Sequence, residues 1–312
     1  MKDWSVGIKI VDSLLVKSAE KKLTKTKKSF LTLVLSDGRD DIIANMWDYN
    51  EDFVPEANTV IKVLAKVGEY MGKQQLTIDS FGVEEDADIA QFLPRGNFDI
   101  EEYLQKARLL IAGIKDQDLL QLTTNLFERH IPLWKIAPSA NGIHHAYLGG
   151  NLKHSVDTCC KAKAIAEITN GCNIDLCVAG AILHDIGKLF TYKFDQAIIG
   201  MTEEGILKDH IIIGIQMLEV YRVPSNGKIL NILEHIIASH HGERAFGSPV
   251  TPKFAEALIV AQADLLDARL ASLEEECSKS NGSHTTGKIW IFENHPMYTQ
   301  EFICSILPKG EI

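Results

Sequence analysis

Leu-Cys-Val-Ala-Gly-Ala-Ile-Leu-His-Asp-Ile-Gly-Lys occupies residues 176–188, where an apolar run ends in an imidazole and a carboxylate. An apolar run of this kind predicts a buried helix that leads directly into His184 and Asp185. Because removing a carboxylate from water is costly, a buried aspartate is rarely left without partners. The stretch therefore predicts a helical core in which other segments supply groups that interact with Asp185.

Four other segments place histidine or aspartate beside apolar helical sequence. They contain His154, His210, the pair His240-His241, and Asp264. A single histidine on an apolar helix is more often a hydrogen-bonded core residue than a ligand, but the whole set would require five separate polar intrusions into one core. Imidazoles grouped around carboxylates are typical of divalent-metal sites, and one carboxylate can bridge two ions. With nitrogen and oxygen ligands and no nearby cysteine, Mn, Fe, Co, Ni and Zn are all compatible.

The first part of the chain has the pattern of a small β domain. Apolar and polar residues alternate in short runs at 6–10, 30–35, 42–47, 59–67 and 75–83. Five short strands without a long helix indicate an oligonucleotide-binding (OB) barrel, in which closure removes most sheet edges, with half of a generic β-sandwich as the competing interpretation. We expect an α+β multidomain chain: a five-stranded OB-fold β-barrel at 1–85, a polar linker at 86–100, an all-α helical bundle at 101–272 and a C-terminal extension at 273–312.

Composition excludes several classes of protein. The chain has 312 residues, of which 46% are hydrophobic and 24% charged, as expected for about two globular domains. Its longest apolar run falls far short of the ~20 residues of a membrane span, and the N-terminus has no apolar signal core, so we expect a cytoplasmic protein without a membrane partner. Six cysteines without a Cys-x-x-Cys pair favour neither a disulfide scaffold nor a zinc ribbon. The net charge of −10 does not exclude nucleic acid, because lysines crowd between Lys17 and Lys28.

The ordered set of His154, His184-Asp185 and Asp264 resembles the His…His-Asp…Asp signature of HD-domain phosphohydrolases. The additional His210 and His240-His241 resemble the subset of that superfamily with two metals. Three further segments make the chain similar to the YhaM family of bacterial 3′→5′ exoribonucleases, which carry an N-terminal OB domain. These segments are His-His-Ala-Tyr-Leu-Gly-Gly at 144–150, Ser-His-His-Gly-Glu at 239–243 and Asp-Leu-Leu-Asp-Ala at 264–268.

The resemblance implies a ligand set for two divalent cations. One ion would be held by His154, His184, Asp185 and Asp264, and the second by Asp185, His210, His240 and His241. Two ions about 3.5–4 Å apart can clamp the attacking and leaving oxygens of an in-line displacement. Mn²⁺ is the favoured ion, with Fe, Co, Ni, Mg and Zn as alternatives. Asp185 and Lys188 are the expected catalytic residues, with Lys188 stabilising charge on a phosphate oxygen.

The implied activity is metal-dependent 3′→5′ hydrolysis of single-stranded RNA, with DNA left open, to nucleoside 5′-monophosphates. OB folds bind single strands through a basic groove with aromatic stacking platforms. The candidate contacts in the barrel are Lys25, Lys27, Lys28, Lys73, Phe30, Trp47 and Tyr49.

The HD scaffold alone does not fix the chemistry, so other functions stay open. They are a nucleotide or cyclic-nucleotide phosphohydrolase, a di-iron oxygenase, and a nucleic-acid-binding protein with a structural HD domain. Cyclic-di-nucleotide enzymes carry Gly-Tyr-Pro after the histidine pair, whereas this chain has Gly242-Glu243-Arg244, which disfavours that alternative. Assembly of several copies into a homo-oligomer is also left open.

Overall fold

A computed structural model describes residues 4–38, 40–70, 72–140, 145–195, 198–223, 226–280 and 282–307. The chain divides into two compact units. One consists of Met1–Gly96 with Phe194–Ile199, and the other consists of Asn97–Lys193 with Gly200–Ile312. Among the described residues, no helix combines the length and the apolarity that crossing a bilayer requires.

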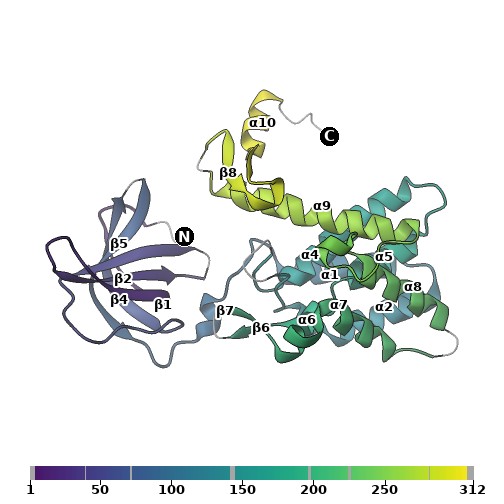
Figure 1. Cartoon of the computed structure of the whole chain (residues 1–312), viewed down its shortest axis with the longest axis horizontal. Coiled ribbons are helices and arrows are strands. Elements are labelled where there is room, and N and C mark those ends of the chain that lie inside the picture. The colour runs from purple at the N-terminus through teal and green to yellow at the C-terminus, as the bar shows by residue number, and fades with distance from the viewer. Residues whose placement is uncertain are drawn as a thin grey trace. The chain divides into compact units, whose positions relative to one another are not determined.

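The first unit is built on a closed five-stranded barrel (Figure 1). Its strands are β1 (Lys9–Leu23), β2 (Ser29–Ser36), β3 (Asp41–Trp47), β4 (Val60–Tyr70) and β5 (Lys73–Val83). They follow the order β1-β2-β3-β5-β4, with antiparallel neighbours except for the parallel pair β3–β5. This closure confirms the predicted OB-type barrel, and the β-sandwich interpretation is wrong.

Period-two alternation positions the barrel core. On β2, Leu31, Leu33 and Leu35 are completely buried, while the residues between them are only partly covered. A short 3₁₀ helix at Ile89–Phe92 lies against a second apolar cluster formed by Leu15 and Val60. The first part of the expected linker at 86–100 is therefore packed against the barrel instead of being a solvated connection.

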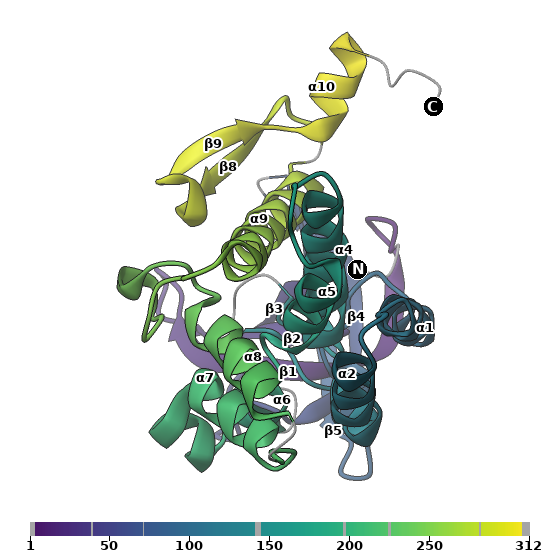
Figure 2. The ribbon, with the colours of Figure 1, turned by 90° about the vertical axis from the view of Figure 1, so that its right-hand side faces the viewer.

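The second unit is mainly helical (Figure 2). Its helices are α1 (Ile100–Ala112), α2 (Gln117–Arg129), α3 (Ile131–Trp134), α4 (Gly150–Glu167), α5 (Ile174–Leu183), α6 (Lys188–Thr191), α7 (Glu203–Glu219), α8 (Gly227–Ser239) and α9 (Ala255–Ser278). A short hairpin, β6 (Tyr192–Asp195) and β7 (Ile198–Met201), separates α6 from α7. Side-chain caps begin several of these helices: Asp99 accepts from two amides of α1, and Asn173 accepts from Leu176 N of α5.

Helix α5 is the centre of this unit. All its residues from Cys177 to Leu183 are buried, and it packs against α2, α4, α8 and α9. Gly180 lets α8 approach closely, because an added Cβ would lie 2.7 Å from Ile236 Cδ1. Helix α9 continues without a break past the expected boundary at residue 272. The chain then forms the hairpin β8 (Thr285–Ile289) and β9 (His295–Tyr298), followed by α10 (Gln300–Ile306).

Among the described glycines of the helical unit, Gly187 leaves the least room for a side chain, and its replacement tests this packing. An added Cβ would lie 1.9 Å from the carbonyl oxygen of His210 and 2.7 Å from Gly214 N. Because neither backbone atom can swing away, Gly187→Ala is expected to lower the free energy of unfolding by about 1–3 kcal/mol. Urea denaturation followed by circular dichroism measures the change.

Gly200→Ala is the matched control, because nothing lies within 4 Å of a Cβ at that position. It should change stability by no more than about 0.5 kcal/mol. Equal stability of the two variants would contradict the close contact at Gly187.

Candidate metal centre

The carboxylate of Asp185 lies at the centre of a buried cluster of histidines. Asp185 follows directly on the end of α5 and is 1% exposed, and His184 beside it is completely buried. Helices α4, α7, α8 and α9 bring the other predicted ligands to this point. The structure thus assembles all seven: His154, His184, Asp185, His210, His240, His241 and Asp264.

One oxygen of Asp185 faces the first group of predicted ligands. Its Oδ2 lies 3.4 Å from Nε2 of His154 and 3.4 Å from Nε2 of His184. Those two nitrogens are 3.2 Å apart, and Asp264 Oδ1 lies 3.1 Å from His154 Nε2. Two imidazoles and two carboxylates therefore converge on one small volume.

The other oxygen of Asp185 faces the second group. Its Oδ1 lies 3.5 Å from Nε2 of His210 and 3.4 Å from Nε2 of His240. The centroid of the His241 ring lies 4.1 Å from that of His240 and 5.2 Å from that of His210. One ring nitrogen of each of these three histidines lies within 4.8 Å of the other two. Asp185 is accordingly the residue shared by the two groups.

Several polar atoms of this cluster have no hydrogen-bond partner in the described structure although they are buried. They are both carboxylate oxygens of Asp185, Nε2 of His210, Nε2 of His240 and Nδ1 of His241. Lys188 Nζ forms an ion pair with Asp185 Oδ2 at 2.7 Å. Since buried polar atoms are almost always paired, imidazole nitrogens without partners around a buried carboxylate fit divalent cations well.

Backbone and carboxylate acceptors orient four of the imidazoles. Nδ1 of His184 lies 2.7 Å from Ala181 O, and Nδ1 of His240 lies 2.7 Å from Ile237 O. Nδ1 of His154 and of His210 each lie 2.6 Å from a carboxylate oxygen, on Asp267 and Asp209 respectively. Because an oxygen acceptor requires the proton on Nδ1, each Nε2 faces the cluster and is the ring atom that would bind a metal.

The electrostatics divide the histidines into two kinds. Burial lowers the pKa of His210 and His240, and it lowers that of His241 to about 4, so these rings are neutral near pH 7. Burial also opposes charge on His154, but hydrogen bonds to Asp264 and Asp267 outweigh it and raise its pKa to about 10. Without a cation, a proton on His154 compensates the nearby carboxylates.

Asp185 itself remains ionised. Desolvation favours its protonated form, but the charge of Lys188 and the neighbouring imidazoles hold its pKa well below the usual value. The same pairing raises the pKa of Lys188, whose side chain is 14% exposed. A charged lysine thus stands beside the shared carboxylate at the edge of the cluster.

Comparison with known proteins identifies the family. The family model for the HD domain matches residues 151–269, which include all seven predicted ligands. A protein of Geobacillus sp. (strain WCH70), "3′-5′ exoribonuclease YhaM", is 30% identical over 308 residues, covering 96% of this chain and 94% of the relative. The chain belongs to the YhaM family. The similarity spans both units of the chain.

The barrel of this YhaM-family chain also has a structural neighbour. The second OB-fold domain of replication protein A from Methanococcus maripaludis aligns with a TM-score of 0.22 and 16% identity, covering 27% of this chain and 90% of that domain. The OB-type fold assigned here depends on the strand order and closure of the barrel itself.

Around His154 lies a set of supporting residues whose role the sequence motifs do not predict. Asp267 accepts from His154 Nδ1 at 2.6 Å, and its other oxygen lies 2.7 Å from Lys161 Nζ. His145 Nε2 lies 3.1 Å from the same carboxylate. The spacing contained the signal, because residues three apart on a helix share a face and Asp267 follows Asp264 on α9. His144, which belongs to the motif at 144–150, lies outside the described residues.

Asn151 also supports the centre. It is completely buried on α4, and its Nδ2 donates to the carbonyl oxygen of Asp185 at 3.1 Å. The hydrogen bond joins α4 to the backbone of the shared carboxylate.

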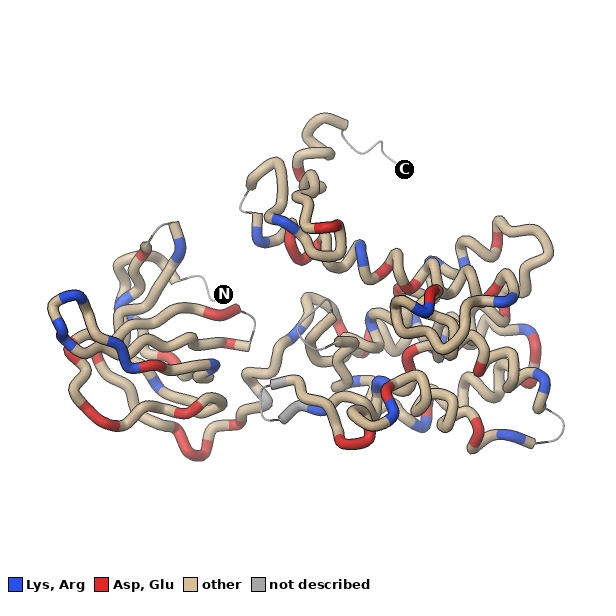
Figure 3. Tube along the Cα trace, in the orientation of Figure 1, with Lys and Arg blue, Asp and Glu red and all other residues tan. Residues whose placement is uncertain are grey.

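The candidate RNA contacts of the barrel fall into two sets. Lys25, Lys27 and Lys28 lie exposed in the turn between β1 and β2, where Figure 3 shows basic residues gathered, and Lys73 is exposed after the β4–β5 turn. The rings of Phe30 and Trp47 stack on the paired strands β2 and β3 with their centroids 4.9 Å apart, and Trp47 is 51% exposed.

Tyr49 differs from the other aromatic candidates. It is only 3% exposed, packs near Phe81 in the barrel core, and donates its hydroxyl to Phe53 O at 2.5 Å. A ring buried in this way cannot receive a base on its face, so the expected stacking role of Tyr49 is withdrawn.

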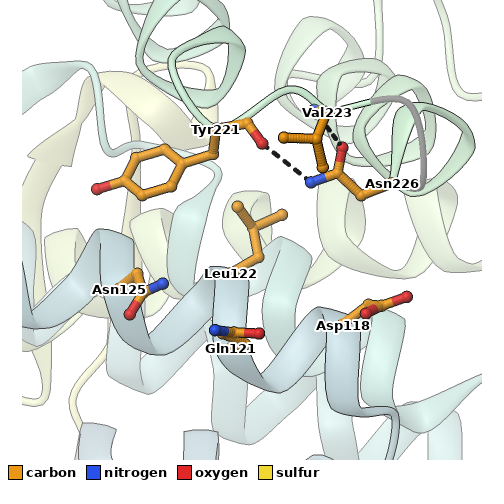
Figure 4. Close-up of a pocket in the computed structure, with 7 residues that line it drawn as sticks. All are labelled: Asp118, Gln121, Leu122, Asn125, Tyr221, Val223 and Asn226. Carbon is orange, nitrogen blue, oxygen red and sulfur yellow. Dashed lines mark hydrogen bonds between the residues drawn. The ribbon is translucent and has the colours of Figure 1, made fainter.

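A separate pocket of about 220 Å³ lies on the helical unit (Figure 4). The side chains of Asp118, Gln121 and Asn125 approach it from α2, and Tyr221 and Asn226 border it from the segment between α7 and α8. None of its lining residues belongs to the histidine–aspartate cluster. Asp118 therefore offers a control position for substitutions in the centre.

Asp267 supplies a test of the supporting layer. Replacing Asp267 by Asn removes the negative charge behind His154, and loss of such a partner typically weakens metal binding by about 10- to 100-fold. Titration of metal-stripped protein with Mn²⁺ by calorimetry measures the effect. Asp118→Asn is the same chemical change outside the cluster and should leave the Mn²⁺ affinity as in the wild type; equal affinities for all three proteins would contradict the role of Asp267.

Proposed function

We propose that this chain is a metal-dependent exonuclease that degrades single-stranded RNA from its 3′ end and releases nucleoside 5′-monophosphates. The observation that carries the proposal is the position of Asp185, whose two oxygens face two separate groups of buried imidazoles. The YhaM relative supports it, because its name gives the 3′-5′ exoribonuclease activity and the similarity covers 96% of this chain.

The residues of the centre divide between two cations. His154, His184, Asp185 and Asp264 would hold one ion. Asp185, His210, His240 and His241 would hold the other, since each set surrounds one oxygen of the shared carboxylate. Two bound divalent cations supply Lewis acidity, an activated water near neutral pH and charge stabilisation for in-line displacement at phosphorus. Mn²⁺ is the ion we favour, and the nitrogen and oxygen donors also suit Fe, Co, Ni, Mg and Zn.

Lys188 adds positive charge beside the reacting phosphate. Its ammonium group lies 2.7 Å from Asp185 Oδ2 and is held in the charged form by that carboxylate. In our proposal, the entering phosphodiester takes over part of this ion pair, and Lys188 stabilises charge that develops on a non-bridging oxygen. Asp185 and Lys188 are thus the catalytic residues of this proposal.

The barrel would hold the RNA strand. The stacked pair of Phe30 and Trp47 presents aromatic surface on β2 and β3, and the exposed lysines of the β1–β2 turn can contact phosphates. Because stacking and phosphate contacts do not read the 2′-hydroxyl, single-stranded DNA is expected to bind as well.

The activity is tested with purified protein that has been stripped of metal and restored with Mn²⁺. On 5′-labelled single-stranded RNA and DNA we expect a ladder that shortens from the 3′ end and disappears with chelator. Asp185→Asn should remove both the ladder and Mn²⁺ binding, because the variant loses the charge shared by the two groups of ligands, whereas Asp118→Asn should retain both. Intact oligomers with every metal, or full activity of Asp185→Asn, would refute the proposal.

Trp47 tests the role of the barrel. Stacking of a base contributes ~1–3 kcal/mol, so Trp47→Ala is expected to raise the Kd for single-stranded RNA by about 5- to 150-fold. Hydrolysis of bis-p-nitrophenyl phosphate, which is too small to need the barrel, should stay unchanged. Trp290→Ala removes a tryptophan of the C-terminal extension that is 71% exposed, more than Trp47 at 51%, and serves as the control. Unaltered RNA affinity of Trp47→Ala would contradict capture by this face.

A further inference from the structure

Helix α7 contains an aspartate in a backbone conformation that normally belongs to glycine. Asp209 has φ 60° and ψ 163°, so the helix stops at this residue and starts again at His210. Residues other than glycine have a strained backbone in this region of φ and ψ, and such strain persists only where the surrounding structure enforces it. Glycine would satisfy the backbone better, which means that the side chain of Asp209 must account for its presence here.

The break in α7 places His210 beside Asp185. The carbonyl oxygen of His210 lies so close to Gly187 that even a methyl group on Gly187 would meet it at 1.9 Å. Gly187 follows Asp185 by two residues, so this contact joins α7 directly to the segment of the shared carboxylate. Figure 2 shows α7 and α6, which begins one residue after Gly187, next to each other. An unbroken helix through residue 209 would direct His210 differently.

The carboxylate of Asp209 fixes the imidazole of His210. Its Oδ1 accepts from the backbone N–H of His210 and from Nδ1 of the ring, both at 2.6 Å. The ring therefore carries its proton on Nδ1, and Nε2 points to Asp185 Oδ1 at 3.5 Å without another partner. The side chain of Asp209 is 68% exposed whereas that of His210 is 7% exposed, so the carboxylate acts from the solvent side of the ring.

The two groups of ligands share this arrangement. In the first group His154 is backed by the carboxylate of Asp267, and in the second group His210 is backed by Asp209. The other oriented imidazoles, His184 and His240, are backed by neutral carbonyl oxygens. Each side of Asp185 thus has one imidazole whose basicity is increased by a carboxylate, which strengthens a metal ligand.

We propose that Asp209 is a positioning residue for the cation on the His210 side of Asp185, where its carboxylate holds the Nε2 lone pair of His210 toward the ion at the expense of a strained backbone. This inference rests on the proposed two-cation centre. It adds that the second ion depends on a solvent-exposed residue that does not contact the ion itself.

Three variants separate the carboxylate from the backbone. Asp209→Gly removes the carboxylate and relieves the strain in the backbone. Asp209→Asn keeps an oxygen acceptor in a residue type that tolerates positive φ. Glu293→Gly is the control, because it replaces an acidic residue with φ 56° in the C-terminal extension. Metal-stripped proteins are titrated with Mn²⁺ by calorimetry, and the tautomer of His210 in the metal-free proteins is read by ¹⁵N nuclear magnetic resonance.

For the wild type we expect two Mn²⁺ ions and a His210 ring protonated on Nδ1. Asp209→Gly should unfold at a temperature no lower than the wild type, bind one ion normally, bind the other about 10- to 100-fold more weakly and lose the single tautomer. Asp209→Asn should restore most of the affinity, and Glu293→Gly should match the wild type.

Two results would overturn the inference. The first is that Asp209→Gly binds two ions as tightly as the wild type does. The second is that the tautomer of His210 is unchanged in that variant. A single ion in the wild type would instead refute the two-cation proposal, and the inference with it, whereas failure of Asp209→Gly alone leaves the proposed exonuclease intact.

Discussion

The free energy of burying the Asp185 carboxylate constrains the whole helical unit. The charge lies at the end of α5 among apolar side chains, where an isolated carboxylate would be neutralised or excluded. Five helices therefore direct imidazole or carboxylate groups to this point, and Lys188 adds a positive charge at its edge. The packing of the unit follows from the need to bring those groups within reach of one another.

Close backbone contacts and fixed tautomers give the centre its precision. Gly187 allows α7 to approach the segment that follows α5, because an added Cβ would meet the backbone of α7. Gly180 lets the Ile236 side chain of α8 lie against α5. Oxygen acceptors behind His154, His184, His210 and His240 place every Nε2 toward Asp185. The predicted ligand set is thus preorganised in the protein alone, which would reduce the rearrangement that cation binding requires.

Much of this structure could be predicted because its signals are local in the sequence. Leu31, Leu33 and Leu35 alternate with less buried residues and predict their strand, and His184-Asp185 after an apolar run predicts a buried polar pair. The role of Asp267 could not be seen in the same way, because a supporting carboxylate looks like any acid on a helix. Burial of Tyr49 depends on which side of the barrel its strand end faces, which composition does not determine. The break at Asp209 could not be predicted either, because it lies where α7 packs against a distant segment of the chain, with the carbonyl oxygen of His210 close to Gly187.

The closure of the barrel has a consequence for how the first unit moves. Strands β3 and β5 close it through a parallel pairing of only three residue pairs, from Ile43 with Gln75 to Asn45 with Thr77, whereas β4 and β5 pair along most of their length. Parallel pairing is also the slightly weaker kind per residue. The β3–β5 seam is therefore where the cylinder parts most readily into an open sheet, and its amides should lose protection from solvent exchange before those of the other strand pairs.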